Sequence, residues 1–293
     1  MAKRRPPTVH GLAIVDKPAG VTSHDVVNQM RRHFGEKRIG HAGTLDPDAT
    51  GVLLIGVGSV TRLLRFLTEA GKSYVGEVVF GTETSTLDAA GEVTATHDMT
   101  GVTLEAARAA AAAHLTGEIL QVPPMVSALK VGGRRLHELA REGIEIERAP
   151  RPVTVRRLEL EATDDPMVLR IDVDCSSGTY IRTLAADLGH LLGGGAHLRN
   201  LRRTAVGSFT IAEARPPAEC ELLPPPVAMR DHTQVVVDDA VAALVRTGRV
   251  LPAFDGPAPW VLLDGSGELL AVYEAFRSGE AKPCVVLAGA FDQ

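Results

Sequence analysis

The sequence predicts an α+β protein with a large N-terminal domain, residues 1–230, and a small β-rich domain, residues 231–293. Three observations lead to this assignment. Short apolar strands are interspersed with amphipathic helices as far as residue 211. Two groups of prolines, at 216–217 and 224–226, then have the composition of a linker. Beyond them β-type runs dominate, and 293 residues are enough for one large and one small domain.

The elements of the first half follow from apolar spacing and from cap residues. An apolar strand covers residues 11–15 and stops at a turn. Ser23 has the side chain of an N-cap, and apolar residues recurring on one face predict a helix from His24 to Phe34, which Gly35 ends. The other elements predicted here are a short helix from Val60 to Leu67, a strand from Lys72 to Phe80, a loop from Gly81 to Gly91 and an alanine-rich helix from Leu104 to Leu115.

The second half contains an inserted basic flap near residues 121–150. Pro123 and Pro124 hold its start extended, and a glycine pair at 132–133 precedes a short basic helix. The elements predicted after the flap are strands from Val153 to Glu161 and from Met167 to Cys175, a helix from Thr179 to the glycines at 193–195, a short basic stretch from Leu198 to Thr204 and a strand from Val206 to Ile211.

Composition indicates an ordinary globular protein and argues against several classes. Apolar runs of membrane-spanning length and an N-terminal secretory segment are missing from the sequence, so we expect a cytoplasmic protein. Three widely spaced cysteines argue against a disulfide framework and a structural zinc. Nucleotide-binding glycine motifs are missing too, so we expect no cofactor. His41 with Asp46 and Asp48 is weak evidence for a metal site, and we expect no metal.

Charge is distributed unevenly along the chain. The net charge is -5, but residues 1–212 hold 25 Lys and Arg against 24 Asp and Glu, so the acidic excess lies at the C-terminal end. The basic residues of the first part come in groups, which is typical either of a phosphate-tracking face or of solvated helix and strand faces. The acidic C-terminal part is expected to contribute less to binding of nucleic acid.

The most unusual stretch runs from Gly40 to Gly51 and combines glycines with a proline, a histidine and two carboxylates. Helix and strand interiors tolerate this mixture poorly, so the whole stretch is predicted to be a shaped loop. It is either a polar connection or a loop that holds a reactive side chain against a substrate. An Asp such as Asp46 can act as a nucleophile when a neighbouring Arg keeps it ionised, and Tyr or His rings can stack on a base taken out of its helix.

The same stretch resembles the signature loop of the tRNA pseudouridine-55 synthases, the TruB family. Further stretches are similar to the motifs of that family in the same order, and together they span residues 11–207. The matching stretches are Asp16-Lys17-Pro18-x-Gly20, Lys72-x-Tyr74, Gln121-x-Pro123-Pro124-Met125-x-Ser127-Ala128-Leu129-Lys130, Gly133-x-Arg135, Ser177-Gly178-Thr179-Tyr180-Ile181-Arg182 and Gly195-Ala196-His197-Leu198-x-x-Leu201-Arg202-Arg203.

The resemblance implies a pseudouridine-synthase fold, with a mixed, mostly antiparallel sheet, flanking helices and a PUA-like C-terminal domain. It implies a cofactor-free isomerase that flips uridine 55 out of the T-loop of tRNA and replaces its C–N glycosidic bond by a C–C bond. The expected partner is the T-loop region of tRNA. We expect neither a membrane nor an obligatory protein partner, and a monomer.

The resemblance also assigns catalytic residues. Asp46 would be the nucleophile or the electrostatic partner of the sugar or the base. Arg182 would pair with Asp46 and hold it ionised, and Tyr180 would lie near the ribose as a candidate proton acceptor.

Five residues would bind the substrate, Tyr180 among them. Tyr74 would stack on the flipped uracil, and Leu201 would line the uracil pocket. His41 would fill the space that the flipped nucleotide leaves in the T-loop, and Lys17 would either support the site or contact a phosphate.

Two positions depart from the family pattern, and two other functions stay open. Ser85 stands where many relatives carry an acidic residue, and Val126 stands where an aromatic residue is frequent, which predicts a weaker grip of the flap on RNA. The alternatives are a tRNA-binding folding chaperone without essential catalysis and a synthase acting on another RNA, such as the RNA-guided relative that modifies ribosomal RNA.

Overall fold

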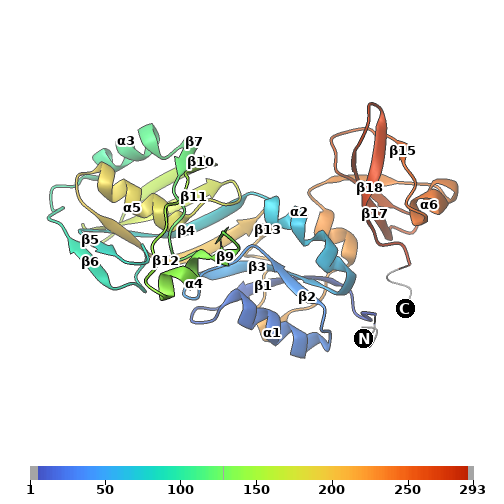
Figure 1. Ribbon diagram of the computed structural model, residues 1–293, viewed down its shortest axis with the longest axis horizontal. Helices are drawn as coiled ribbons and strands as arrows, with labels where there is room; N and C mark the ends of the chain where they lie inside the picture. Colours follow the sequence, from blue (N-terminus) through green and yellow to red (C-terminus); the bar gives the residue numbers. More distant parts are fainter. Residues whose placement is uncertain (1–5, 128, 290–293) are drawn as a thin grey trace.

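The computed structural model describes residues 6–127 and 129–289, which form a large sheet with helices on it and a smaller C-terminal sheet (Figure 1). The helices, with the 3-10 helices labelled η, are α1 Ser23–Phe34, η1 Gly58–Leu63, α2 Leu64–Glu69, α3 Leu104–His114, α4 Leu136–Arg141, α5 Ile181–Leu191, η2 Pro217–Glu219, η3 Pro225–Met229 and α6 Asp239–Arg246. The strands up to the flap are β1 Gly11–Lys17, β2 Ile39–Ala42, β3 Thr50–Val57, β4 Lys72–Phe80, β5 Thr82–Thr84, β6 Val93–Thr96 and β7 Gly117–Gln121. The later strands are β8 Lys130–Val131, β9 Arg134–Arg135, β10 Arg151–Ala162, β11 Val168–Cys175, β12 Ala196–Val206, β13 Phe209–Thr210, β14 Thr233–Val236, β15 Leu251–Pro252, β16 Trp260–Leu263, β17 Leu269–Ala275 and β18 Glu280–Val286.

The large sheet has nine strands in the order β1-β3-β12-β4-β11-β10-β7, with β2 paired to β3 and β13 paired to β12. Only β3 and β12 run parallel among its described pairs, so the predicted mixed, mostly antiparallel sheet is confirmed. The parallel pair brings β12, late in the sequence, against the strand that follows the Gly40–Gly51 stretch.

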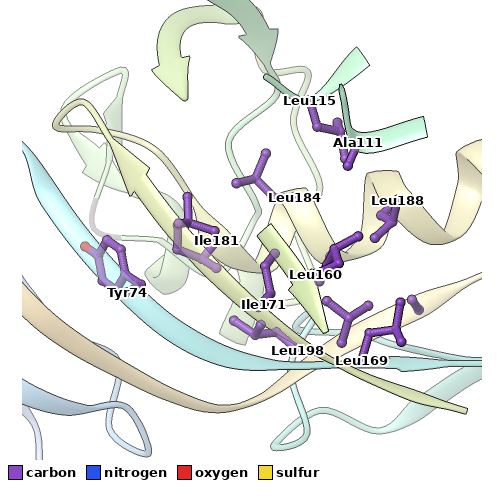
Figure 2. Packing of buried hydrophobic residues seen from close by; sticks show 14 of the residues in the cluster. Tyr74, Ala111, Leu115, Leu160, Leu169, Ile171, Ile181, Leu184, Leu188 and Leu198 are labelled. Atoms are coloured by element: carbon purple, nitrogen blue, oxygen red, sulfur yellow. The ribbon is translucent and has the colours of Figure 1, made fainter. Parts of the chain in front are cut away.

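Separate helices cover the two halves of the sheet. At one end α1 buries Val26 and Met30 against apolar residues of β1 and β3. At the other end α5 and α3 pack on β4, β10 and β11, which forms the core drawn in Figure 2. Helix α5 is buried over most of its length, from Ile181 to Gly189, whereas α3 buries only Ala107 and Ala111. Burying a leucine in such a core stabilises the fold by about 1.5–3 kcal/mol.

Helix α1 begins differently from the prediction. Its N-cap is Thr22, not Ser23, because the Thr22 hydroxyl accepts a hydrogen bond from the backbone N–H of Asp25 while the Asp25 carboxylate accepts one from the backbone N–H of Thr22. Ser23 is buried instead. Its hydroxyl is free to bind another part of the chain.

The Gly40–Gly51 stretch is a loop only in its middle, from 43 to 49. Gly40 lies in β2 and Gly51 lies in β3, so the predicted loop was too long at both ends. The glycines are there because other groups come very close. A Cβ at Gly51, which has a φ of 101°, would lie 2.1 Å from the backbone oxygen of Arg203 on β12.

Two other predicted elements have different bounds. The predicted helix from Val60 to Leu67 is a 3-10 helix followed by α2. The basic stretch 198–204 is not a separate element, because it belongs to the long strand β12, which turns at Gly207 into the short strand β13. The strand predicted from Val206 to Ile211 is therefore interrupted. Strand β12 ends at Val206, the chain turns at Gly207, and β13 covers only Phe209–Thr210.

The C-terminal part is β-rich, with a five-stranded sheet in the order β14-β16-β17-β18-β15 and the helix α6. One face of this sheet packs with α6, and the other belongs to a buried cluster that also contains Leu63 and Leu67 of the N-terminal part. Among the helices of residues 6–127 and 129–289, none is long and apolar enough to cross a membrane.

We expect Gly51→Ala to lower the free energy of unfolding by at least about 2 kcal/mol, because the new Cβ meets backbone and the φ is left-handed. Urea denaturation measures the change. The control is Gly101→Ala, where a Cβ meets nothing within 4 Å and we expect a change below about 1 kcal/mol. Equal losses for the two variants would contradict the close contact between β3 and β12.

Candidate active site

A cavity of about 390 Å³ lies where the loop 43–49 faces the start of α5, which is within the range of about 300–1,000 Å³ typical of small-ligand sites. Five of the seven residues predicted from the sequence line it, namely Asp46, Tyr74, Tyr180, Arg182 and Leu201. The other two, His41 and Lys17, do not. Further residues in its wall include Thr44, Thr68, Glu69, Lys72, Ser127, Thr179 and Arg203.

Asp46 and Arg182 form an ion pair in the wall of the cavity. The Arg182 Nε lies 3.0 Å from Asp46 Oδ2, and its Nη2 donates to Asp46 Oδ1 at 3.3 Å. The Arg182 side chain is 4% exposed and that of Asp46 39%. The fork-like guanidinium therefore fixes the carboxylate from the protein side, while the carboxylate still faces the cavity.

Arg182 holds three further groups, which belong to two other segments of the chain. It donates to the backbone oxygens of Thr86 and Val126, both at 2.8 Å, and its Nη1 lies 3.4 Å from Asp88 Oδ2. Val126 belongs to the start of the predicted flap. A single guanidinium thus connects the Asp46 loop, the Asp88 loop and the root of the flap.

Opposing effects set the pKa of Asp46. Burial raises it above its ordinary value, and the negative charge of Asp88 adds to the rise. The positive charges of Arg182 and Lys17 oppose it. The charge of Arg182 favours the ionised carboxylate, but burial outweighs this effect.

Lys17 supports the loop from below. Its side chain is fully buried, and Nζ donates to the backbone oxygens of Pro18, Pro47 and Ala49 at 2.9, 2.8 and 2.6 Å. Burial lowers the pKa of Lys17 to about 8, against the opposing charges of Asp48 and Asp46. Of the two predicted roles, the geometry supports the first, because these bonds leave no ammonium hydrogen for a phosphate.

Two residues to which the sequence analysis gave no role in the site, Ser23 and Gln121, position Asp46 and Tyr180. The Ser23 hydroxyl accepts from the backbone N–H of Leu45 at 2.9 Å and donates to the Leu45 oxygen at 3.1 Å, which fixes the residue before Asp46. The Gln121 amide accepts from the backbone N–H of Tyr180 at 2.7 Å and donates to the Tyr180 oxygen at 3.0 Å. Gln121 belongs to one of the stretches that match the family motifs. The partner of Ser23, Leu45, is 22 residues away, so no local sequence pattern indicated this contact.

Tyr74 and Leu201 come from the neighbouring strands β4 and β12. Tyr74 is 8% exposed, and Figure 2 shows its hydroxyl pointing away from the leucines of the core. Burial raises the pKa of Tyr74, so its phenol is neutral at pH 7. The cavity thus offers an aromatic ring and an aliphatic side chain close to the Asp46 carboxylate.

His41 lies in β2, beside the loop and outside the cavity wall. Burial lowers its pKa, and the positive charges of Arg203 and His24 lower it further. The imidazole is therefore neutral at pH 7. A neutral, partly exposed ring suits stacking on a base better than binding a phosphate.

Lys72 and Arg203 are the other two cations in the cavity wall. Both belong to stretches that match the family motifs, but the sequence analysis gave them no role in the site. Lys72 is two residues before Tyr74 and Arg203 is two residues after Leu201. Because alternate strand residues face the same side, this spacing was a signal that they share the cavity.

The chemistry available here is that of a carboxylate, an aromatic ring and cations. Within residues 6–127 and 129–289, no group of three or more His, Cys, Asp or Glu side chains is arranged to hold a metal ion. The combination can bind a planar ring on Tyr74 and Leu201 and present a carboxylate to the group attached to that ring.

Comparison with known proteins gives a consistent family. Residues 31–181 match the model of the TruB family pseudouridylate synthase N-terminal domain, and residues 182–216 match that of the tRNA pseudouridylate synthase B C-terminal domain. The chain is 44% identical to tRNA pseudouridine synthase B of Arthrobacter sp. (strain FB24), with 97% of this chain and 98% of that protein covered. It is 54% identical to the protein of the same name from Mycobacterium sp. (strain KMS), with 70% of each covered.

A solved structure shows the same fold. The chain superposes on one chain of a Cbf5-Nop10-Gar1 complex with a TM-score of 0.70 and 24% identity, with 97% of this chain and 81% of that one covered.

We expect Asp46→Asn to melt at a higher temperature than the wild type at pH 7. A carboxyl whose pKa folding raises destabilises the folded state once it is ionised, so this cost grows as the pH rises through the raised pKa. The difference in melting temperature should shrink as the pH falls through the raised pKa toward the ordinary value of 3.8, because the wild-type carboxyl then takes up its proton. Thermal denaturation followed by circular dichroism measures it.

The control is Asp25→Asn in the capping box, where hydrogen bonds from Thr22 lower the carboxyl pKa. Its charge stabilises the fold above the ordinary pKa and this contribution is lost at lower pH, so this variant should melt below the wild type at pH 7. A lower melting temperature for Asp46→Asn at pH 7 would show that pairing with Arg182 outweighs burial.

Proposed function

We propose that this chain, which belongs to the TruB family of pseudouridylate synthases, converts uridine 55 in the T-loop of tRNA to pseudouridine. Membership of the family makes the chain an isomerase. The relatives named tRNA pseudouridine synthase B support tRNA as the substrate. The observation that carries the proposal is the Asp46–Arg182 pair in a cavity that also contains Tyr74 and Leu201.

The reaction that we propose is balanced within the nucleotide. The bond from N1 of uracil to C1′ of the ribose breaks, a bond from C5 to C1′ forms, C5 loses its proton and N1 gains one. The base must leave its helix for this to happen, which costs a few kcal/mol, and stacking on Tyr74 returns about 1–3 kcal/mol of it.

The proposed roles follow from position. The Asp46 carboxylate is the nucleophile, and Arg182 holds it in place and favours its ionised form. Tyr180, at the N-cap of α5 in the cavity wall, is the candidate acceptor of the C5 proton. His41, with its neutral ring beside the cavity, fills the space that the flipped nucleotide leaves in the T-loop stack.

The supporting parts have proposed roles as well. We place the domain boundary near residue 230, just before β14, and assign the five-stranded C-terminal sheet to a PUA-like domain. The flap near 121–150 grips the RNA, and its Arg182 contact at Val126 ties that grip to the catalytic pair. A monomer in the cytoplasm that acts without an obligatory protein partner completes the proposal.

We expect the wild type to form pseudouridine in an unmodified tRNA transcript, and Asp46→Asn to be slower by at least about 1,000-fold, because loss of a nucleophile removes the chemical step. Mass spectrometry of the digested tRNA measures conversion, and filter binding measures affinity, which should change by less than about threefold. If both proteins bind but neither converts the tRNA, the chain is a tRNA chaperone or acts on another RNA.

The acid limb of the pH profile of kcat/KM should report the ionisation of Asp46. We expect Arg182→Gln to move this limb to higher pH by about one unit or more, because the cation that lowers the Asp46 pKa is lost.

Asp88→Asn should move the limb to lower pH, because the Asp88 charge raises the pKa of Asp46. These opposite shifts make each variant the control of the other. An acid limb that stays in place in both variants would mean that another group titrates there.

A further inference from the structure

The cavity contains two cations, Lys72 and Arg203, to which the proposed reaction assigns no role. Lys72 is on β4, two residues before Tyr74, and Arg203 is on β12, directly paired with Tyr74 in the strand register. All three side chains therefore lie on one face of the sheet, next to each other.

The two cations are close together. The Cβ that an alanine would add at Gly43 would lie 3.5 Å from Arg203 Nη1 and 3.6 Å from Lys72 Cε. Both side chains thus border the same small volume, which is open because residue 43 is a glycine. Exposure is 7% for Lys72 and 1% for Arg203, so both are taken out of bulk water.

Neither cation has a carboxylate partner within the described parts of the chain. Lys72 Nζ donates to the backbone oxygens of Thr68 and Ala70 at 2.7 and 2.6 Å. Arg203 donates from Nε to the Val52 oxygen at 2.7 Å and from Nη2 to the Gly43 oxygen at 3.1 Å. Arg203 also forms a hydrogen bond with the Tyr74 hydroxyl. These bonds use two of the three donors of the lysine and three of the five of the arginine.

The electrostatic balance of this corner is unfavourable without an anion. Burial and, to a lesser extent, the charge of Arg203 together lower the pKa of Lys72 to about 8. Buried charges in proteins are normally paired, because an unpaired one keeps the cost of its desolvation. Glu69 is in the same cavity wall, but it is exposed, and it forms no ion pair with either cation within the described residues.

We propose that Lys72 and Arg203 form a subsite for an RNA backbone phosphate that borders the flipped uridine. The proposal rests on the proposed function, since it needs a nucleotide in the cavity. A phosphate group offers several acceptor oxygens, which match an ammonium and a guanidinium side by side. With the base on Tyr74, the corner at Lys72 lies two positions away along β4, about 7 Å.

The subsite would have a consequence for the reaction. A phosphate held at Lys72 and Arg203 fixes one end of the nucleotide, while stacking on Tyr74 fixes the other. The ribose between them is then held against Asp46, and positioning of this kind accelerates a reaction without a new chemical group.

The test uses a T-arm stem–loop RNA that carries one uncharged methylphosphonate, either 5′ or 3′ of the target uridine. The dissociation constant and kcat/KM are measured for the wild type and for Lys72→Met. At one of the two positions, we expect the methylphosphonate to raise the dissociation constant of the wild type roughly tenfold and to lower its kcat/KM roughly tenfold. This is the effect of losing one charge-assisted hydrogen bond. Lys72→Met should lose roughly tenfold on unmodified RNA and nothing further on the modified RNA, because the lost partners are the same pair.

Two further variants complete the test, one as a control and one as a replacement for Lys72→Met. Lys282→Met removes an exposed lysine of the C-terminal sheet and should keep the wild-type sensitivity to the methylphosphonate. If Lys72→Met does not fold, Lys72→Gln, which still donates to one of the two carbonyls, takes its place.

The subsite would be overturned if, for both methylphosphonate positions, the effects of Lys72→Met and of the modified RNA multiplied to a loss of roughly 100-fold. So would a wild type that treats both modified RNAs like the unmodified one, whatever the variants do. Conversion of unmodified RNA by the wild type tests the proposed function. The coupling of Lys72 to a phosphate is also measured by binding, so the subsite and the proposed function can fail independently of each other.

Discussion

The buried guanidinium of Arg182 is the group on which the arrangement of the site depends. It is bound to Asp46, to Asp88 and to two backbone oxygens, and these four partners belong to segments between residues 46 and 126 that the chain order separates widely. A buried cation that has such partners costs less free energy than an unpaired one, and Arg182 keeps these partners only if the segments keep their places. The position of Asp46 thereby depends on the segment at 86–88 and on Val126, which Arg182 also contacts.

Function and stability are in opposition at the loop. The carboxylate of Asp46 is held in a place where burial disfavours its charge, and Lys17 is buried beneath it to satisfy three carbonyls of a backbone that has no regular structure. Substitution of Asp46 by an uncharged residue would relieve its desolvation cost, whereas substitution of Lys17 would leave three backbone oxygens without their donor. On the role proposed for Asp46, the local arrangement is selected for chemistry, and the rest of the fold supplies the stability.

Much of the fold and part of the site could be predicted from the sequence. Alternation and helical spacing gave most elements, and the family motifs named five of the residues that line the cavity. The misses have a common cause, namely partners distant in sequence. Thr22 and Ser23 both have cap-forming hydroxyls, and only Leu45, across the fold, decides which one caps the helix. Gly51 has a poor strand propensity, but the approach of Arg203 requires it. Burial of Lys17 is likewise a property of the assembled loop, not of its neighbours in sequence.

The most direct test of the account is a crystal structure of Asp46→Asn bound to a T-arm stem–loop RNA, since the Asn variant should hold the uridine without converting it. We predict that the target uridine leaves the T-loop, that its ring lies against Tyr74 and Leu201, and that its ribose lies beside residue 46. A uridine that stays stacked in the T-loop, or a base bound away from this cavity, would contradict it.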